Sequence, residues 1–284
     1  MSLFSYMNRC LAISCIFAAA LVIAPPAALA GDGPNQGSVS LSTSVDVTTA
    51  YFFRGIVQED QGSIIQPAVE VGFSLSDNLS LSVGIWNSFH DGPSGTAGGA
   101  TDPESWYESD LYISAGTSLS DDLDGSVTLT WYTSPNDAFA TVTEVAIGLS
   151  IDDSDGLALS PSLTLAMETS NSAFGAEEGT YLELGIEPSL APFANGNLQN
   201  VALSMPITLG LGIDDYYETA TDDDDFGFLD IGIVGSMPLS VPASYGSWTL
   251  SAGVHYLMLG DNTEAANGGD DDEIIATVGI SMGY

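Results

Sequence analysis

Residues 274–284 read IIATVGISMGY, and this stretch decides the fold. Its even-numbered positions carry the apolar side chains together with the terminal Tyr284, and most of its odd-numbered positions carry small or polar ones. Successive side chains of a β-strand point to opposite faces, so this alternation predicts a strand with one apolar face and one small or polar face. The same rhythm occurs at 79–86 and at 144–151.

Working outward from this strand, the alternation recurs along the rest of the chain. We expect twelve strands, at 39–53, 66–75, 79–88, 108–119, 126–134, 142–151, 157–169, 180–189, 201–213, 226–236, 248–259 and 273–284. Pro206 interrupts the ninth stretch, where a closed sheet has no edge strand to tolerate a missing N–H donor. We therefore expect a bulge there, or a strand that effectively starts at Ile207.

The connections between these strands also alternate in length. Tight turns are predicted at 76–78, 120–125 and 152–156, with Asp-Gly turn chemistry in the last two. The intervening connections, such as 89–107 and 214–225, are longer and rich in Gly, Asp and Asn. Short periplasmic turns and long external loops are typical of an outer-membrane barrel, and here the long external loops are also acidic. The predicted fold is therefore all-β, a closed antiparallel transmembrane β-barrel of about 12 strands with both chain ends on the short-turn side.

A soluble β-sandwich would alternate too, so the residues of the second face decide between the two folds. Here that face carries mainly Ser, Gly, Thr and Ala with widely spaced carboxylates, which suits a wet barrel interior. The apolar faces carry almost no charge, as lipid contact requires. Aromatic side chains near strand ends suggest two interfacial girdles. These are Tyr51, Phe53, Trp131, Trp248 and Tyr284.

The amino terminus predicts export from the cytoplasm. Arg9 precedes an apolar run from Leu11 to Ile23, and Ala28-Leu29-Ala30 forms a small-residue cleavage site. We therefore expect a signal peptide at 1–30, a short N-terminal lead at 31–38 and a single outer-membrane barrel at 39–284. The terminal aromatic residue, Tyr284, is expected to serve as the signal for the barrel-assembly machinery of a Gram-negative bacterium.

The charge balance excludes one large class of function. The chain has 38 acidic residues and 2 basic ones, and beyond residue 30 the single cation is Arg54. Nucleic-acid binding depends on Lys and Arg neutralising phosphates, so we expect no nucleic-acid partner. Both cysteines, Cys10 and Cys15, lie in the predicted signal peptide, so no disulfide is expected in the exported part.

Residues 44–58, which read SVDVTTAYFFRGIVQ, resemble the opening of a family of bacterial exported β-proteins grouped as TorF or Gcw-chp putative outer-membrane proteins. The similarity continues through Gln66-Pro67-Ala68-Val69, Gly72-Phe73 and Val83-Gly84-Ile85-Trp86, and covers roughly residues 44–90. In that family, a first strand ends in an aromatic-x-x-Arg-Gly stretch and a later strand carries Gly-x-Trp. The resemblance implies an outer-membrane location and a barrel fold, and it implies no substrate.

The inward phase of the strands gathers ionisable side chains. The lumen-lining candidates are Asp46, Arg54, Glu70, Asp110, Glu144, Glu168, Glu183 and Asp230. Twelve strands lined by Ser and Gly should leave free volume, and carboxylates in a pore attract cations. Arg54 is expected to pair with a neighbour such as Glu70 or Asp110.

Two external loops hold clusters of acidic residues without the spacing of a known calcium loop. Solvated acidic loops are the simpler interpretation, and weak binding of calcium or magnesium is the hypothesis. The weak cation-binding candidates are Asp222, Asp223, Asp224, Asp225, Asp270, Asp271, Asp272 and Glu273. No other cofactor is expected.

Three functions remain open. The leading prediction is a porin-like passive channel for small, cation-preferring solutes, in contact with outer-membrane lipid. The alternative is a non-conducting structural, adhesion or ion-capturing barrel that displays acidic loops, which a lumen closed by inward-folding loops would favour. A lipid hydrolase would need a His–Ser or His–Asp contact, and neither His90 nor His255 lies in a compact motif with a nucleophile. We expect no catalytic residues and no enzyme activity.

Overall fold

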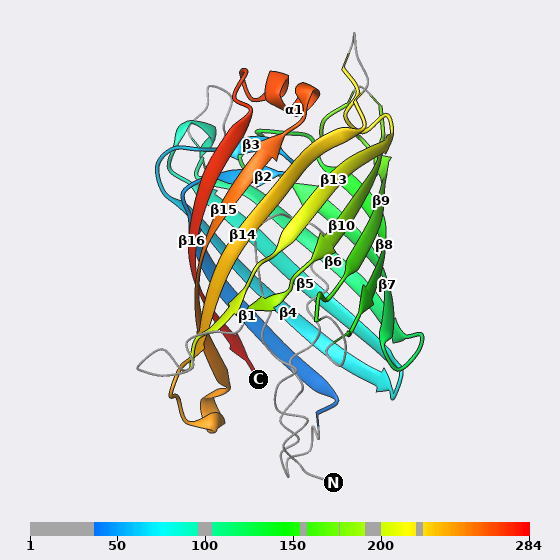
Figure 1. Ribbon diagram of the computed structural model, residues 1–284, viewed down its shortest axis with the longest axis vertical. Helices are drawn as coiled ribbons and strands as arrows, with labels where there is room; N and C mark the ends of the chain where they lie inside the picture. Colours follow the sequence, from blue (N-terminus) through cyan, green and yellow to red (C-terminus); the bar gives the residue numbers. More distant parts are fainter. Residues whose placement is uncertain (1–36, 96–103, 154–157, 176, 191–199, 220–223) are drawn as a thin grey trace.

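The computed structural model describes residues 37–95, 104–153, 158–175, 177–190, 200–219 and 224–284 (Figure 1). The predicted signal peptide and residues 31–36 of the lead lie outside these ranges. The first wall strand, β1, begins at Val39 and the last, β16, ends at Gly283.

Antiparallel pairing carries the wall of the barrel once around, and the pairings of β1 with β16 and of β14 with β15 close it. Every strand pair along the wall is antiparallel, and the closure gives each of the described wall strands a partner on both sides (Figure 1). The wall strands are β1 (Val39–Thr48), β4 (Ile64–Ser76), β5 (Leu79–His90), β6 (Trp106–Ser118), β7 (Leu123–Thr133), β8 (Val142–Ile151), β9 (Ser162–Ser170), β10 (Thr180–Ile186), β13 (Ile207–Asp214), β14 (Phe226–Pro238), β15 (Ser247–Leu259) and β16 (Asp272–Gly283). The predicted closed barrel of 12 antiparallel strands is confirmed.

Prolines interrupt two neighbouring wall strands. The short segment β11 (Ser189–Leu190) follows β10 beyond Pro188, and β12 (Ala202–Ser204) precedes β13 across Pro206. Pro206 cannot donate a hydrogen bond, but its carbonyl accepts one from the Gly232 amide at 2.8 Å. The strand resumes at Ile207, which is one of the two arrangements expected from the sequence.

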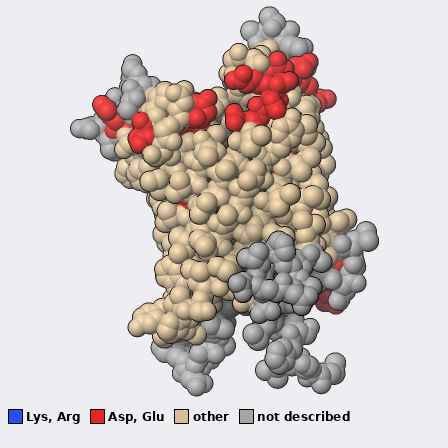
Figure 2. Space-filling model, turned by 60° about the vertical axis from the view of Figure 1, so that its left-hand side comes forward, with Lys and Arg blue, Asp and Glu red and all other residues tan. Residues whose placement is uncertain are grey.

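The outer surface of the wall is apolar. Its outward-pointing side chains are exposed over large fractions, as at Ile233 (58%), Val278 (56%), Val254 (54%) and Val47 (48%). In the view of Figure 2, most of the acidic atoms are at the loop end, above a wall almost without acidic atoms. Soluble proteins rarely expose continuous apolar surfaces of this extent, so the wall is a lipid-facing surface and the protein is a transmembrane β-barrel.

Helices contribute little to the structure. They are η2 (Pro93–Gly95), η3 (Ala243–Tyr245) and α1 (Asp261–Ala266). Within the described ranges, no helix has the length and apolar character needed to cross a membrane.

The connections at the two ends of the barrel differ less sharply in length than predicted. The turn at Asp77-Asn78 is tight, as expected. In contrast, the connection between β8 and β9 runs from 152 to 161, so a tight turn at 152–156 was wrong, and part of that segment lies outside the described residues. Asp124 and Gly125 belong to strand β7, where they pair with Ser118 and Thr117, so they are not turn residues.

The largest departure concerns the first predicted strand, 39–53. β1 ends at Thr48, and the chain then turns into the barrel as a two-stranded hairpin of β2 (Tyr51–Phe53) and β3 (Ile56–Glu59) (Figure 1). We call residues 51–59 the plug hairpin. Tyr51 and Phe53 are 4% and 8% exposed, so their assignment to an outer aromatic girdle was wrong. Trp131 and Trp248 do lie on the outward phase of their strands, and Tyr284 is exposed.

Candidate functional site

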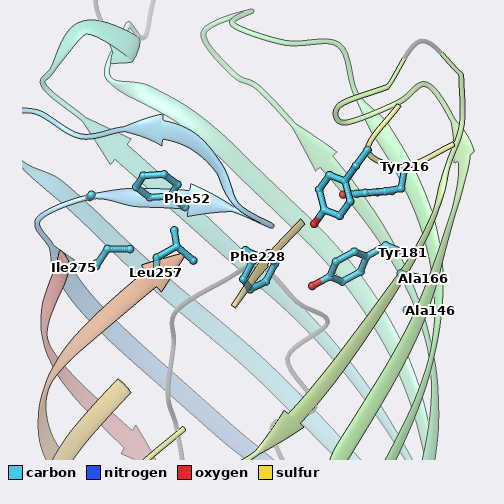
Figure 3. Close-up of a cluster of buried hydrophobic side chains, with 10 residues drawn as sticks. Phe52, Ala146, Ala166, Tyr181, Tyr216, Phe228, Leu257 and Ile275 are labelled. Atoms are coloured by element: carbon cyan, nitrogen blue, oxygen red, sulfur yellow. The ribbon is translucent and has the colours of Figure 1, made fainter. Parts of the chain in front are cut away.

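The plug hairpin lies across the lumen and contacts opposite walls of the barrel. Tyr51 and Phe53 belong to one buried cluster with Tyr107 and Tyr132 of β6 and β7. Phe52 points the other way, into a second buried cluster that includes Leu257 and Ile275 of β15 and β16. Figure 3 shows Phe52 beside these two residues. Three consecutive aromatic residues, 51–53, thus pack on both faces of the hairpin. This stretch therefore lacks the alternation of apolar and polar residues that marks a wall strand.

The tip of the hairpin is a two-residue turn made by Arg54 and Gly55. Both residues have positive φ, 48° and 83°, which is the signature of a type I′ turn. Gly55 suits this conformation and also the crowding, since a Cβ there would lie 3.3 Å from the Cβ of Phe228. The turn places the guanidinium of Arg54 deep in the lumen, where the residue is 1% exposed.

Arg54 is held by a carboxylate and by aromatic rings. Its two terminal nitrogens donate to Glu144 of β8 at 2.6 and 2.9 Å, a bidentate geometry. One of them also donates to the hydroxyl of Tyr216 at 3.0 Å, and the guanidinium carbon lies 4.1 Å from the centre of the Tyr181 ring. The expected pairing of Arg54 with Glu70 or Asp110 was therefore wrong, because the inward turn carries the side chain away from β4 and β6.

The electrostatic environment keeps the tip charged. Burial alone would lower the pKa of Arg54, but the carboxylate of Glu144 reverses this effect and the pKa is raised well above its ordinary value. Burial raises the pKa of Tyr216, although Arg54 opposes the shift, so Tyr216 remains a neutral phenol. The single cation of the lumen is therefore neutralised by Glu144 and is not free to bind an anion.

The other lumen-lining candidates near the hairpin are also inside the barrel. Tyr51 donates to Glu108 at 2.9 Å, and Glu108 and Asp110 are both 3% exposed. Glu70 accepts from the hydroxyl of Tyr112 at 3.0 Å. Sequence reasoning placed Asp110 and Glu70 on the inward phase but missed Glu108, which lies on the same phase two positions before Asp110, at the start of the expected strand.

The remaining candidates line the opposite part of the wall. Glu168 accepts from two backbone amides, at 2.7 and 2.9 Å, and Glu183 accepts from Tyr181 at 2.8 Å. Asp230 lies 2.7 Å from Nδ1 of His255, and both residues are 2% exposed. Asp46 is 9% exposed. All eight candidates thus lie on the inner surface or on the plug hairpin, and Arg54 and Glu144 are brought into direct contact.

The sequence suggested that inward glycines would leave free volume in the lumen, but the structure fills the space beside several of them. Several lie directly opposite a large inward side chain, namely in the cross-strand pairs Gly84 with Tyr112, Gly210 with Phe228, Gly232 with His255 and Gly279 with Asp46. In each pair a Cβ on the glycine would lie within 2.3 Å of the opposite side chain. The glycines therefore make room for the residues that fill the lumen.

The lumen consequently has two parts. The upper lumen, at the loop end, contains the plug hairpin and the two buried clusters. The lower lumen, toward the chain ends, is lined by small hydroxyl side chains that are mostly part-exposed. These are Ser42, Ser82, Ser114, Ser126, Ser150, Ser251 and Ser281.

A second polar network fixes the base of the plug hairpin. Ser94 donates to Glu59 at 2.8 Å, so its oxygen accepts from Nδ1 of His90 at 2.7 Å, and Nε2 of His90 then accepts from Ser88 at 2.7 Å. The ring of His90 stacks on Tyr107, with 4.4 Å between centroids. This network connects the end of β3 to the wall strand β5.

The His90 network contains the His–Ser contact that a hydrolase would require, and the Asp230–His255 pair is a His–Asp contact. Ser88, however, is 0% exposed and His90 1% exposed. A nucleophile must be reached by its substrate, and here the polar atoms are satisfied by one another beneath the hairpin. The arrangement therefore anchors the hairpin.

The acidic cation-binding candidates do not form a ligand cluster in the described part of the chain, where no group of three or more potential ligand residues has metal-binding geometry. Asp222 and Asp223 lie outside the described residues. Asp224 accepts from the backbone amides of Phe226 and Asp261, at 3.1 and 3.2 Å. Asp225 and the segment from Asp270 to Glu273 are at the loop end. Weak binding of calcium or magnesium there stays a hypothesis.

Comparison with solved structures finds several outer-membrane proteins with low sequence identity. An outer-membrane channel from Pseudomonas putida F1 aligns with 87% of this chain and 96% of its own, at a TM-score of 0.49 and 10% identity. The KdgM porin aligns with 86% and 99%, at a TM-score of 0.45 and 8% identity. LpxR from Salmonella typhimurium aligns over the same shares, at a TM-score of 0.44 and 8% identity. No curated protein matches the sequence.

A family model described as "Bacterial protein of unknown function (Gcw_chp)" matches residues 32–245. The match contains the whole plug hairpin and extends well beyond residues 44–90, where the sequence resemblance was seen. The Gcw-chp part of that resemblance is confirmed, while the TorF label stays a prediction. The chain belongs to the Gcw_chp family of bacterial proteins of unknown function.

Proposed function

We propose that this protein is an outer-membrane channel for small solutes, with a preference for cations, in which the plug hairpin limits conduction. The observation that carries the proposal is the division of the lumen. The lower lumen offers a hydroxyl-lined, part-exposed passage, and the plug hairpin occupies the upper lumen. A loop that folds into a barrel narrows the passage without disturbing the wall.

The preference for cations is supported by the charges inside the barrel. Carboxylates such as Glu70, Asp110 and Asp230 lie on the inner surface, while the single cation, Arg54, is paired with Glu144. Carboxylate-lined pores attract cations and repel anions. The solute itself is proposed only as a class, small and preferably positively charged.

The location follows from the apolar outer wall and the predicted export signal. We infer residence in the bacterial outer membrane after removal of residues 1–30, with assembly directed by the last strand. Amino-terminal sequencing of protein from isolated outer membranes should begin at Gly31. A sequence that begins at Met1, or recovery of the protein in the soluble fraction, would contradict this inference.

A planar-bilayer recording tests the channel. The informative variant replaces residues 50–62 with a short Gly-Ser linker between Thr49 and Ser63, which removes the plug hairpin and leaves the wall. We expect the variant to conduct more than the native protein and to give a reversal potential that favours cations. The matched control replaces residues 240–245 with the same kind of linker. These residues lie in the connection between β14 and β15, at the opposite end of the barrel, and this variant should conduct like the native protein.

A second function is favoured by one observation. The residues that surround the plug hairpin are almost fully buried, with Tyr181, Tyr217 and Phe228 all 0% exposed. Such packing also suits a barrel that never conducts and serves a structural role in the envelope. A hairpin-deleted barrel that inserts into the bilayer but stays silent would support this second function and overturn the channel. A reversal potential that favours anions would overturn the cation preference.

A further inference from the structure

The tip of the plug hairpin is held from above by the external loop that joins β15 to β16. This loop, residues 260–271, contains α1 and lies more than two hundred positions from the hairpin in the sequence. The side-chain amide of Asn267 makes two hydrogen bonds to the hairpin backbone. Its nitrogen donates to the Gly55 carbonyl at 2.7 Å, and its oxygen accepts from the Val57 amide at 2.9 Å.

A second connection runs from the same loop through a tyrosine. Asn262, which is 5% exposed, donates to the Tyr217 carbonyl at 2.7 Å, and the Tyr217 hydroxyl donates to the Arg54 carbonyl at 2.9 Å. Loop 260–271 thus satisfies the Gly55 carbonyl directly, and it holds the backbone of Tyr217, whose hydroxyl satisfies the Arg54 carbonyl. Burial raises the pKa of Tyr217, so this phenol keeps the proton that it donates.

The loop is itself fixed to the wall at one end. Thr263, which is 0% exposed, donates to the Gly227 carbonyl at 2.6 Å, and the Gly260 amide donates to the Thr263 hydroxyl at 2.8 Å. At its other end, Gly268 and Gly269 have positive φ, and a Cβ added to either would meet no described atom within 4 Å beyond its chain neighbours. The end that bears Asn267 is therefore loosely packed, whereas the start of the loop is tightly packed.

We propose that loop 260–271 is a clasp that keeps the plug hairpin seated, with Asn267 as the residue that positions it. This inference rests on the proposed function only for its consequence, which is that the seated hairpin limits conduction. The physical reason is the cost of unpaired backbone groups. If the clasp lifts, the Gly55 carbonyl and the Val57 amide lose their partners inside a nearly dry lumen, and the seated hairpin becomes less favourable.

Thiol accessibility tests the clasp without depending on conduction. Ala146 of β8 is 3% exposed and lies in the same buried cluster as Phe52. The reporter is the full chain with Ala146→Cys, with Cys10 and Cys15 replaced by serine so that one thiol remains. The protein is refolded into lipid vesicles, and the rate of reaction with a membrane-impermeant methanethiosulfonate reagent is measured. Heat-dependent mobility on gels checks that each barrel is folded.

We expect Asn267→Ala to raise the labelling rate of the reporter thiol by about tenfold or more, since the seated state loses two part-buried hydrogen bonds. Asn267→Asp keeps the acceptor for the Val57 amide and loses the donor to the Gly55 carbonyl. Its labelling rate should therefore lie between that of the reporter alone and that of Asn267→Ala. Asn262→Ala should also raise the rate. The matched control is Glu264→Ala in the same helix, because the side chain of Glu264 provides none of the hydrogen bonds to the hairpin described above.

Rates equal to that of the reporter alone in both Asn267→Ala and Asn262→Ala would overturn the clasp, provided that deletion of residues 50–62 makes the reporter thiol reactive. If the deletion leaves that thiol unreactive, the hairpin does not cover this wall, and the proposal is overturned as well. Because labelling needs no ion current, a barrel that never conducts would contradict the proposed function and leave the clasp standing.

Discussion

The upper and lower halves of the lumen are built from the same strands but use them in opposite ways. On β8, Glu144 binds Arg54 of the plug hairpin and Ala146 lies in the same buried cluster as Phe52, and the two are 1% and 3% exposed, whereas Ser150 faces the lower lumen and is part-exposed. The upper half resembles the core of a soluble protein, with aromatic clusters and a buried ion pair. The lower half is a surface of small hydroxyl groups. The difference indicates that one barrel wall can enclose a packed core at one end and a lining of small hydroxyl groups at the other.

The largest effect is expected when the ion pair of the upper lumen is removed. Arg54→Ala leaves Glu144 buried without its partner, and breaking a buried pair in this way costs about 3–5 kcal/mol. Urea unfolding in vesicles, followed by tryptophan fluorescence, should show a loss of this size. The double variant Arg54→Met with Glu144→Gln should recover much of it, because no charge is then left alone. A loss below about 1 kcal/mol in Arg54→Ala would mean that the upper lumen is wet.

Glycine substitutions compare the packing of the two halves. At Gly210 in the upper lumen, a Cβ would lie 2.2 Å from the ring of Phe228, and overpacking of this kind costs roughly 1–3 kcal/mol. At Gly116 in the lower lumen, the nearest atom is the rotatable hydroxyl oxygen of Ser80 at 2.9 Å, so alanine should cost less than about 0.5 kcal/mol. The same unfolding experiment measures both variants. Equal costs at the two positions would contradict the division of the lumen.

The sequence predicted the wall better than its contents, and the reason is physical. Contact with lipid imposes one simple rule on every outward position, and this rule produces the alternation from which the strands were found. The contents of the upper lumen follow no such period, because Tyr51, Phe52 and Phe53 pack in different directions. One local signal was present, since Arg54-Gly55 between two apolar residues fits a two-residue hairpin turn.

The partner of Arg54 could not be found from the sequence. Arg54 and Glu144 are 90 positions apart, and their contact depends on how far the hairpin reaches across the lumen. The structure has carboxylates such as Glu70 and Asp230 on the inner surface, but the alternation of the strands does not say which of them a folded-in loop will approach. Small inward residues likewise did not reveal whether the lumen is filled. A glycine opposite tyrosine or phenylalanine makes room for that large side chain, whereas a glycine opposite serine has no large side chain to accommodate.

The smallest expected effect concerns the root of the plug hairpin. Hydrogen bonds from Ser63 lower the pKa of Asp91 below its ordinary value of 3.8. A depressed folded pKa means that the contribution to stability is present above the unfolded pKa and is lost as the pH falls through the folded value. Amide exchange at Ser63 should therefore accelerate in strong acid, while exchange within the wall strands changes little. Asp91→Asn should remove this acid dependence, and its persistence in that variant would exclude Asp91 as the cause.

The central claim, a packed upper lumen above a wet lower lumen, is tested most directly on a single strand. Ala146→Cys and Ser150→Cys are compared on β8, in the background without Cys10 and Cys15, by their rates of reaction with a membrane-impermeant thiol reagent present on both sides of the vesicle membrane. The account predicts rapid labelling of the thiol at position 150 and labelling at position 146 that is slower by at least about tenfold. Equal rates at the two positions would contradict it.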